Sequence, residues 1–410
     1  MQGNVIKKDD PECCPVLIDK NDTQDLEKCE DVTPDAIKKC EGGIPNIRFR
    51  GFKDDWEQRK LGGLCDITTG KLDANAMVQD GQFDFYTSGV DVYKIDRAAF
   101  EGPAITIAGN GASVGYMHLV DGKFNAYQRT YVLTGFLADR QFLNVAIGNE
   151  LPAKIQEEVR GSGIPYIVLN MLTELNIPFP SHNEQKQIGE FFRNLDHLIT
   201  LHQRKCDETR ELKKYMLQKM FPKDGKKVPE IRFKGFTGEW EQRKVREVAD
   251  RYDNLRIPVA ANLRIPGSTP YYGANGIQDY VEGYTHEGEF VLVAEDGAND
   301  LKNYPVKCVK GRIWVNNHAH VLQGKNEITD NRFLAFAISQ ADIESLLVGG
   351  GRAKLNAETL MGLDLLLPVK QEQVLIGNYF ANLDRLVTLY QRKCDELKEI
   401  KRYMLQNMFP

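Results

Sequence analysis

Hydrophobic residues recur with heptad spacing in two long stretches of the chain. In residues 185–222 the seam follows alternating steps of four and three, with apolar or small side chains at Ile188, Phe192, Leu195, Ile199 and Cys206 and His202 between the last two. Residues 372–410 repeat the pattern more regularly, at Ile376, Phe380, Leu383, Val387, Tyr390, Cys394 and Leu397. Charged residues fill most other positions, so each stretch predicts a helix that packs along this seam. Such a helix is about 55 Å long at ~1.5 Å per residue, too long for one wall of a small domain.

The two helical stretches are copies of one another. Gly189–Pro222 matches Gly377–Pro410 at 23 of 34 positions, and Pro45–Lys60 matches Pro229–Lys244 at 11 of 16. The residues between these repeats have little in common. The pattern indicates an internal duplication that presents two different surfaces on one pseudo-twofold frame, and a simple dimerisation coiled coil is the alternative for the helices alone.

The two variable regions have the period-2 pattern of strands separated by turns. The predicted strand segments, in matching order, are 83–89, 103–120 and 126–135 in the first region, and 269–276, 289–300 and 311–323 in the second. Each region then continues with a helix (140–159 or 332–348), a Gly-x-Gly turn, and a strand that ends at Pro180 or Pro368. The predicted class is α+β, with two strand-rich domains and two long helices that pair within one chain.

These patterns divide the chain into five segments. The predicted segments are an acidic extension (1–43), a first domain (44–184), a first helix (185–222), a linker with a second domain (223–371) and a second helix (372–410).

Charge and composition narrow the functional classes. The net charge is −5, and residues 1–43 account for it with 6 basic and 11 acidic side chains. DNA-binding proteins usually carry a basic excess, so this chain either binds DNA with the help of other subunits or binds something else. No apolar run approaches the ~20 residues of a membrane span, and the start lacks a signal peptide, so we expect a cytoplasmic protein. The eight cysteines lack CxxC spacing and are predicted to be thiols.

Catalytic and metal-binding motifs were sought without success. Asn176–Phe179 resembles a methyltransferase loop but lacks its first proline, and Gly109–Gly115 leads into a strand rather than a helix, which favours a hairpin turn over a nucleotide-binding loop. No Walker A motif is present. His318 and His320 alternate in a strand without a third ligand, and the cysteines at 13, 14, 29 and 40 lack a partner histidine. We therefore predict a non-catalytic chain with no metal and no cofactor of its own.

The repeated motifs resemble a known family. The pattern P-x-I-R-F-x-G-F-x-x-x-W-E-Q-R-K, a strand-rich region, and then E-Q-x-x-I-G-x-x-F-x-x-L-D leading to M-F-P is similar to the specificity subunit of type I restriction-modification systems, over residues 44–410 and in both copies. The resemblance implies an α+β fold in which two target-recognition domains are separated by the two long helices, which run antiparallel. Each domain would read one half of a bipartite double-stranded DNA target. It also implies that the helices set the spacer and dock two modification (methyltransferase) subunits, joined by restriction subunits. S-adenosylmethionine, ATP and Mg would then belong to those partners.

Candidates for DNA contact are polar residues near the predicted turns, because base edges are read by paired hydrogen bonds and phosphates by basic and hydroxyl side chains. In the first region they are Lys71, Tyr86, Thr87, Ser88, Asn110, Ser113, Gln128 and Arg129. In the second they are Arg251, Tyr252, Asn254, Arg256, Tyr271, Tyr272, Asn299, Lys302, Asn316, Asn317, His318, Arg352 and Lys354. The tyrosine clusters recur at equivalent positions, while a solvated loop side chain is the alternative for any single candidate.

Two other functional classes stay open at this point. A coiled-coil adaptor between proteins, with no role at DNA, would use the two variable regions as protein-binding surfaces. An autonomous DNA-modifying enzyme would need a cofactor site that the sequence does not reveal.

Overall fold

The computed structural model describes residues 44–158, 165–223, 225–349 and 353–410. The acidic extension, its four cysteines, the glycines at 161, 163 and 351, and the candidate Arg352 lie outside these residues. The chain divides into two compact units. One joins the described residues up to Leu195 to Glu399–Pro410, and the other comprises Asp196–Lys398.

Two long helices carry the repeated heptad pattern. Helix α3 (His182–Met220) and helix α7 (Lys370–Met408) each contain 39 residues, and both begin slightly before the predicted starts. Pro180 and Pro368 lie just upstream, where proline is compatible with the end of a strand but not with a helix interior. Among the described residues, no helix has the length and apolar content needed to cross a membrane.

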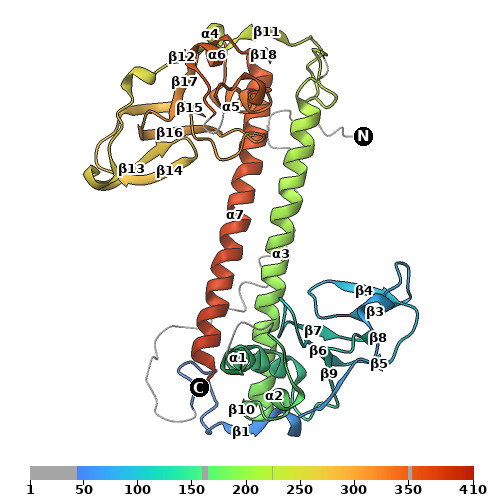
Figure 1. Cartoon of the computed structure of the whole chain (residues 1–410). Helices are drawn as coiled ribbons and strands as arrows, with labels where there is room; N and C mark the ends of the chain where they lie inside the picture. The colour runs from blue at the N-terminus through green and yellow to red at the C-terminus, as the bar shows by residue number, and fades with distance from the viewer. Residues whose placement is uncertain (1–43, 159–164, 224, 350–352) are drawn as a thin grey trace, which may run out of the picture. The chain divides into compact units, whose positions relative to one another are not determined.

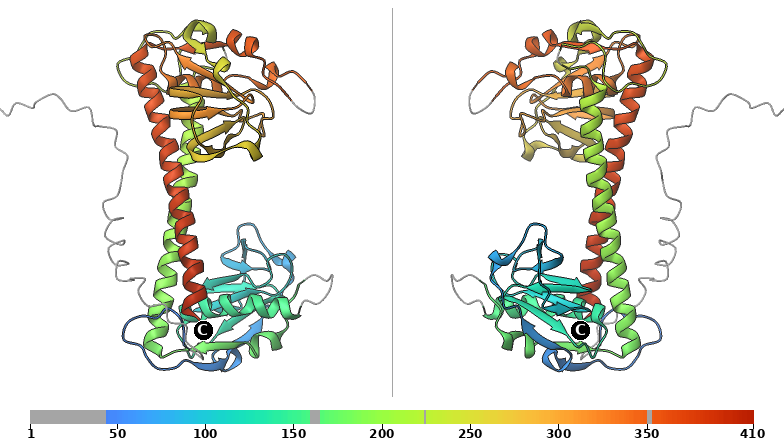
Figure 2. Two further views of the ribbon diagram at one scale, coloured as in Figure 1. Left: turned by 90° about the vertical axis from the view of Figure 1, so that its left-hand side faces the viewer. Right: turned by 90° about the vertical axis from the view of Figure 1, so that its right-hand side faces the viewer.

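Within the second unit the two helices run antiparallel along their central turns (Figure 1; Figure 2). Cys206 Sγ lies 3.7 Å from the carbonyl oxygen of Val387, and Cys394 Sγ lies 3.9 Å from that of Ile199. These contacts are exchanged symmetrically, because each cysteine meets the residue that corresponds to the other's partner. A small side chain is required at both positions for this close approach. The seam is interrupted at Lys213, which is half-buried and forms an ion pair with Asp384 on α7.

The strand-rich part of the first unit consists of two four-stranded sheets. In sheet order, the first contains β2 (Asp66–Thr69), β9 (Thr130–Thr134), β6 (Ala104–Ala108) and β7 (Met117–Val120), and the second contains β4 (Val92–Ile95), β3 (Phe83–Tyr86), β8 (Lys123–Ala126) and β5 (Phe100–Glu101). The β6–β7 pair is an antiparallel hairpin, so the glycine-rich run at 109–115 is the turn that the sequence predicts.

The second unit has the same topology with longer strands. One six-stranded sheet contains, in order, β12 (Ala249–Arg251), β17 (Ala319–Gly324), β15 (His286–Ala294), β16 (Val306–Val315), β13 (Pro266–Gly273) and β14 (Gly276–Val281). Strand β15 takes the place of β5 and β6, and β16 takes the place of β7 and β8. A parallel pair recurs, with Tyr86 opposite Ala126 and Tyr272 opposite Val315. The two regions are diverged copies of one fold.

Helices of matching position follow each set of strands. Helix α1 (Arg140–Glu158) agrees with the predicted range, whereas α5 (Asn331–Ser339) is shorter than the predicted 332–348. The amide of Gln340 caps α5 by bonding to the carbonyl groups of Phe336 and Ala337, and a separate 3-10 turn, η6 (Glu344–Leu346), follows. The remaining short helices are η2 (Leu61–Gly63), η3 (Ala74–Ala76), α2 (Leu169–Thr173), α4 (Val245–Val248), η4 (Asp253–Leu255), η5 (Ala261–Leu263) and α6 (Ala357–Gly362).

The W-E-Q-R-K repeats form short strands that tie each domain to its long helix. Strand β1 (Glu57–Lys60) pairs antiparallel with β10 (Asn176–Phe179), and β11 (Glu241–Lys244) pairs with β18 (Asp364–Leu367). Strands β10 and β18 each end two residues before a long helix begins. Asn176–Phe179 is therefore the end of a strand, as the sequence predicts.

Each domain core is completed by the last turn of the long helix that starts in the other copy. In the second unit, Phe221 stacks on Phe333 with ring centroids 5.7 Å apart and meets the edge of Trp240 at 5.8 Å. In the first unit, Phe409 stacks on Phe142 at 6.1 Å and meets Trp56 at 5.8 Å. The M-F-P motif thus supplies an aromatic plug to each core.

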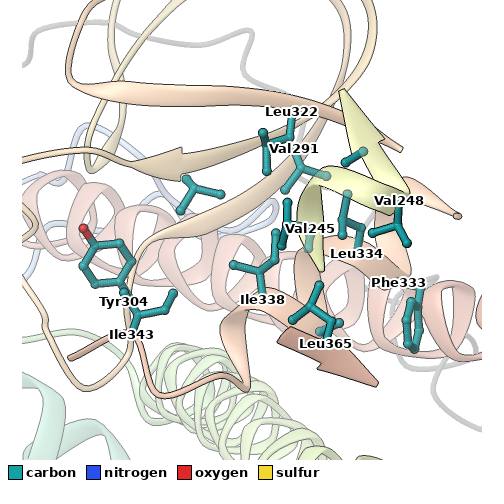
Figure 3. Close-up of a cluster of buried hydrophobic side chains, with 14 of the residues drawn as sticks. Val245, Val248, Val291, Tyr304, Leu322, Phe333, Leu334, Ile338, Ile343 and Leu365 are labelled. Carbon is teal, nitrogen blue, oxygen red and sulfur yellow. The ribbon is translucent and has the colours of Figure 1, made fainter. Parts of the chain in front are cut away.

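The core of the second unit continues from this plug into the sheet. Its buried side chains come from α4, α5, β15, β17 and β18, and Figure 3 labels Val248, Val291, Phe333, Ile338 and Leu365 among them. The predicted seam residues Ile376, Phe380 and Leu383 belong to this cluster. They pack against the domain core and against the end of α3, so the helix seam and the domain core are continuous.

A buried arginine–glutamate pair anchors the start of each long helix. Arg48 Nε lies 2.6 Å from Glu184 Oε1, and Arg232 Nε lies 2.6 Å from Glu372 Oε1; both pairs are bidentate, and neither glutamate side chain is exposed. Hydrogen bonding to Glu184 and to Glu372 raises the pKa of each arginine further. The planar fork of arginine satisfies both carboxylate oxygens, which is what a buried glutamate requires.

A close backbone approach explains the glycine that follows each E-Q pair. A Cβ atom on Gly189 would lie 2.8 Å from the Phe142 amide nitrogen, and one on Gly377 would lie 2.9 Å from that of Phe333. Asp139 and Asp330 cap α1 and α5 at these points. The glycine therefore lets the long helix contact the start of the domain helix.

Replacing Arg232 with alanine should destabilise the second unit by about 3 kcal/mol, because the unexposed carboxylate of Glu372 would lose its counter-charge. Hydrogen–deuterium exchange of peptides from β15 and β17, measured over a urea series, reports this loss unit by unit. Arg243→Ala is the matched control, since it removes an exposed pair with Glu241 and should change exchange little. Equal effects of the two variants would contradict the assigned role of the buried pair.

Candidate functional site

Several loops of the first domain converge at one edge of its sheets through backbone hydrogen bonds. The amide of Gly109 donates to the carbonyl of Arg129 at 2.8 Å, and the amide of Ile167 donates to Gly109 at 2.7 Å. The amide of Tyr127 donates to the carbonyl of Tyr86 at 2.9 Å. These bonds bring together the residues that we name the first loop cluster: Ser88, Asn110, Gln128, Arg129 and Tyr166.

The second domain makes the same three hydrogen bonds. The amide of Glu295 donates to the carbonyl of His318 at 2.9 Å, that of Leu355 donates to Glu295 at 2.8 Å, and that of Asn316 donates to Tyr272 at 3.1 Å. The isolated bridge between Asn110 and Tyr166 also has a counterpart, between Asp296 and Lys354. The second loop cluster comprises Ala274, Asp296, Asn317, His318 and Lys354.

The matched backbone frames carry different side chains at every position. At equivalent positions of the two clusters, the first has serine where the second has alanine, asparagine where it has aspartate, and glutamine where it has asparagine. Arginine and tyrosine of the first cluster correspond to histidine and lysine of the second. The frame is thus the shared part, and the polar groups that it displays are the variable part.

In the first cluster the polar side chains are neutral except for the basic Arg129. Gln128 and Arg129 are exposed, and so is Lys71, next to the bridge between Leu72 and Tyr127. The hydroxyl of Ser88 donates to Asn110 Oδ1 at 2.6 Å. That bond occupies the amide oxygen of Asn110 and directs its role toward donation.

In the second cluster an acid takes the place of Asn110. Asp296 Oδ1 lies 2.5 Å from His318 Nδ1, and Asn316 Oδ1 accepts from the His318 backbone amide at 2.8 Å. Both Asp296 and His318 are half-buried. The carboxylate is thus held in a defined orientation at the surface.

A network of charged groups is joined to the second cluster through Lys354. Arg256 Nη1 lies 2.6 Å from Glu295 Oε2, Lys354 Nζ lies 2.8 Å from Glu295 Oε1, and His320 Nδ1 lies 2.7 Å from Asp253 Oδ2. Burial would raise the pKa of Asp253, but hydrogen bonds from His320 and the Val321 amide lower it on balance.

The pKa of Glu295 is set by the same two opposing effects as that of Asp253, burial and hydrogen bonding. Burial would raise the pKa of Glu295, but hydrogen bonds from Lys354 and Arg256 lower it on balance. Both acids therefore favour their ionised forms.

The acids and the histidine of this network could in principle hold a metal ion. Asp253, Glu295 and His320 each offer one ligand atom, all within 4.8 Å of one another. The guanidinium of Arg256 already bonds Glu295, and both ring nitrogens of His320 meet oxygen acceptors, Asp253 Oδ2 and the Leu355 carbonyl. No ring nitrogen remains for a metal, so the arrangement is that of an ion-pair network.

The sequence-predicted candidates fall into three groups by exposure. The exposed candidates are Lys71, Gln128, Arg129, Arg251, Asn254, Asn299, Lys302 and Asn317. The half-buried ones are Thr87, Ser88, Asn110, Ser113, Tyr252, Arg256, His318 and Lys354. The buried ones are Tyr86, Tyr271, Tyr272 and Asn316.

The candidate tyrosines Tyr86, Tyr271 and Tyr272 are buried in the core, which corrects their prediction as DNA-contact residues. Tyr86 packs against Phe124 with centroids 5.6 Å apart, and its burial, with the charge of Asp84, raises its pKa to about 12. Tyr271 is stacked beneath Arg264, and Tyr272 lies in a core cluster with Phe290. Tyr86 and Tyr272 recur at equivalent positions of β3 and β13, where the last residues of each strand are buried on both faces.

Arg256 also differs from its prediction as a DNA-contact residue, because its guanidinium is engaged by Glu295 inside the network. The sequence did not single out Asp296, Tyr166 or Glu295. Their positions follow from cross-strand pairing, and an acid is not an obvious candidate for DNA contact.

The long helices leave apolar side chains exposed at repeated positions. Leu212 and Tyr215 on α3 are 45% and 51% exposed, and the corresponding Ile400 and Tyr403 on α7 are 46% and 48% exposed. Leu389 lines a hollow on α7 with Asp384, Arg385, Thr388 and Arg392. These exposed residues lie in stretches that the duplication keeps nearly identical.

This sequence and this fold are similar to those of known proteins. Residues 53–209 and 237–399 each match the family described as the type I restriction modification DNA specificity domain. The fold is similar to the crystal structure of a type I restriction-modification system S subunit from M. genitalium. That likeness has a TM-score of 0.72 and 19% identity, and it covers 90% of this chain and 99% of the other.

Two curated relatives match shorter segments. A Haemophilus influenzae protein, provisionally described as a type I restriction enzyme specificity subunit, is 48% identical over 130 residues, which are 32% of this chain and 34% of that protein. The Escherichia coli type I restriction enzyme EcoDI specificity subunit is 43% identical over 136 residues, 33% of this chain and 30% of that protein. The matched segments thus span about a third of the relatives' length.

The chain therefore belongs to the type I restriction-modification DNA specificity family, because the family matches two segments that together make up most of it. This confirms the resemblance that the repeated motifs indicated.

Stability of the second unit should fall in acid because of the charged network. The folded pKa values of Asp253 and Glu295 lie below their ordinary values of 3.8 and 4.5. Their contribution to the free energy of unfolding is therefore full above about pH 4.5 and is lost as the pH falls through the lowered pKa values. Urea midpoints from exchange of β17 peptides, between about pH 7 and pH 3, measure this slope.

Arg256→Ala should make that slope shallower, because it removes a group that lowers both pKa values. Arg312→Ala, which breaks an exposed pair with Glu287, is the control and should leave the slope unchanged. An identical slope in all three proteins would contradict the assigned electrostatics.

Proposed function

We propose that this chain is the DNA sequence-specificity subunit of a type I restriction-modification complex, with each strand-rich domain reading one half of a bipartite target. The observation that carries the proposal is the pair of loop clusters: one backbone frame, repeated, with a different side chain at each of the five cluster positions. Two copies of one fold that carry different side chains in their loop clusters suit a DNA target whose two halves differ in sequence. Family membership favours this function over a coiled-coil adaptor without a role at DNA.

The charge distribution supports a recogniser that works within a larger assembly. The whole chain carries a net charge of −5, although the first loop cluster contains Arg129 and Lys71 lies next to the adjacent bridge between Leu72 and Tyr127. Phosphate contacts supply much of the affinity for DNA, and this chain alone has no excess of basic over acidic residues, with 53 Lys and Arg against 58 Asp and Glu. We infer that methyltransferase subunits complete the basic surface around the duplex.

The helices α3 and α7 fit the role of spacer and docking surface. A continuous helix of 39 residues is about 58 Å long at ~1.5 Å per residue, and we propose that its length sets the spacer between half-sites. The nearly identical repeats would bind two copies of one partner, the modification subunit. Restriction subunits would then join this core complex.

Chemistry is assigned to the partner subunits. In this proposal the chain is not itself an enzyme. S-adenosylmethionine, ATP and Mg would be bound by the methyltransferase and restriction subunits. The loop clusters offer groups that bind and orient DNA, with the acids Asp253 and Glu295 held in ion pairs.

Co-expression with a cognate methyltransferase subunit should yield adenine methylation at one split motif with two unlike halves and a fixed spacer. Single-molecule sequencing of the host genome reads this pattern directly. A chimera with another family member's domain in place of residues 44–184 should change one half and leave the other intact. A co-purifying complex that leaves no split motif would contradict DNA recognition by this chain.

Removing the repeated apolar residues should reduce partner binding one copy at a time. Leu212→Ser with Tyr215→Ser should take the methyltransferase stoichiometry from two toward one, as should Ile400→Ser with Tyr403→Ser, because each pair lies in one repeat. Native mass spectrometry counts the bound subunits. Leu137→Ser, at a residue that is 76% exposed in the first domain, is the matched control. Unchanged stoichiometry in both double variants would exclude this surface.

A further inference from the structure

The two loop clusters differ most sharply at one matched position, which holds Asn110 in the first domain and Asp296 in the second. The position is the same in both domains because three backbone hydrogen bonds and one isolated bridge around it are repeated. The two domains differ there only in the side chain and in the neighbouring residue that hydrogen-bonds to it.

Neighbouring side chains set the hydrogen-bonding character at this position. In the first domain the Ser88 hydroxyl bonds Asn110 Oδ1 at 2.6 Å, so the amide group presents its NH2 as the donor. In the second domain Ala274 stands where Ser88 does and has no hydroxyl. The Asp296 carboxylate is instead oriented by His318 Nδ1 at 2.5 Å.

The chemistry of a carboxylate gives Asp296 the accepting role, which it already has toward His318. An ionised carboxylate accepts through two oxygens with about four lone-pair sites, and it donates nothing. One frame position therefore has a donor in the first domain and an acceptor in the second.

We propose that Asn110 and Asp296 are specificity-determining residues for the two half-sites, and this inference rests on the proposed function. Asp296 would accept from an exocyclic amine, N4 of cytosine or N6 of adenine, in the second half. Asn110 would donate to a base acceptor, such as guanine O6 or thymine O4, in the first half. Ser88 and His318 act as positioning residues for the two readers.

Reciprocal substitutions test this assignment in the complete complex with its methyltransferase subunits. Asp296→Asn should change the preferred base at one position of the second half by about tenfold or more and leave the first half unaltered. Asn110→Asp should do the converse in the first half. The readout is selection of bound duplexes from a randomised library by the purified complex, which reports preference even where methylation is weak.

Charge-matched controls separate recognition from a general effect of charge. Asp342→Asn and Asn75→Asp alter exposed residues outside the two clusters and should leave both halves unchanged. The positioning role has its own test, because Ser88→Ala should relax the preference at the position that Asn110 reads without changing thermal stability.

Each result decides the matter. A one-base change confined to the expected half supports the inference, while unchanged preference in both reciprocal variants overturns it and leaves the proposed function intact. Loss of all sequence selectivity in both variants also overturns it, because the residues would then act on the fold. Failure of the proposed function shows separately, as a wild-type complex that selects no split sequence.

Discussion

The structure depends on one packing constraint: neither domain core is complete without an aromatic plug from the end of the helix that begins in the other copy. Phe221 closes the second core against Trp240, and Phe409 closes the first against Trp56. The amide of Ile47 bonds Asn407 and that of Ile231 bonds Lys219, so the plugged ends are also fixed by the backbone. Helix pairing and domain folding are therefore one event, since burial of large rings dominates core stability.

This constraint explains which parts of the sequence repeat and which vary. The repeated segments supply the plug, the buried arginine–glutamate pair and the glycine that lets the long helix touch the domain helix. Each of these tolerates little change, because a buried charge needs its partner and a crowded backbone needs its glycine. The loop clusters are instead held by backbone hydrogen bonds, which any residue except proline can donate. A specificity protein gains from this division, because its surface can change while its frame stays fixed.

Much of the architecture was predictable from the sequence, and the errors have physical causes. The heptad spacing identified both helices because it extends over many turns, and the glycine-rich run at 109–115 was correctly predicted as a hairpin turn. Tyr86, Tyr271 and Tyr272 were predicted to contact DNA because they lie near turns, whereas the last residues of β3 and β13 are buried on both faces of the strand. Asp296 was missed because its place beside His318 arises from cross-strand pairing, and η6 replaced the predicted end of α5 because the helix is capped at Gln340.

The plug in the first unit has a consequence for the order of events during synthesis. The second unit is one continuous segment, Asp196–Lys398, and all of its described core residues can meet once that segment has left the ribosome. The first unit needs Glu399–Pro410, which is made only after the whole second unit. Domains usually fold from the N-terminus onward as synthesis proceeds, at about 5–20 residues per second. Here the earlier domain must wait for the later one, so an unfinished chain keeps its first aromatic core open to solvent and to chaperones.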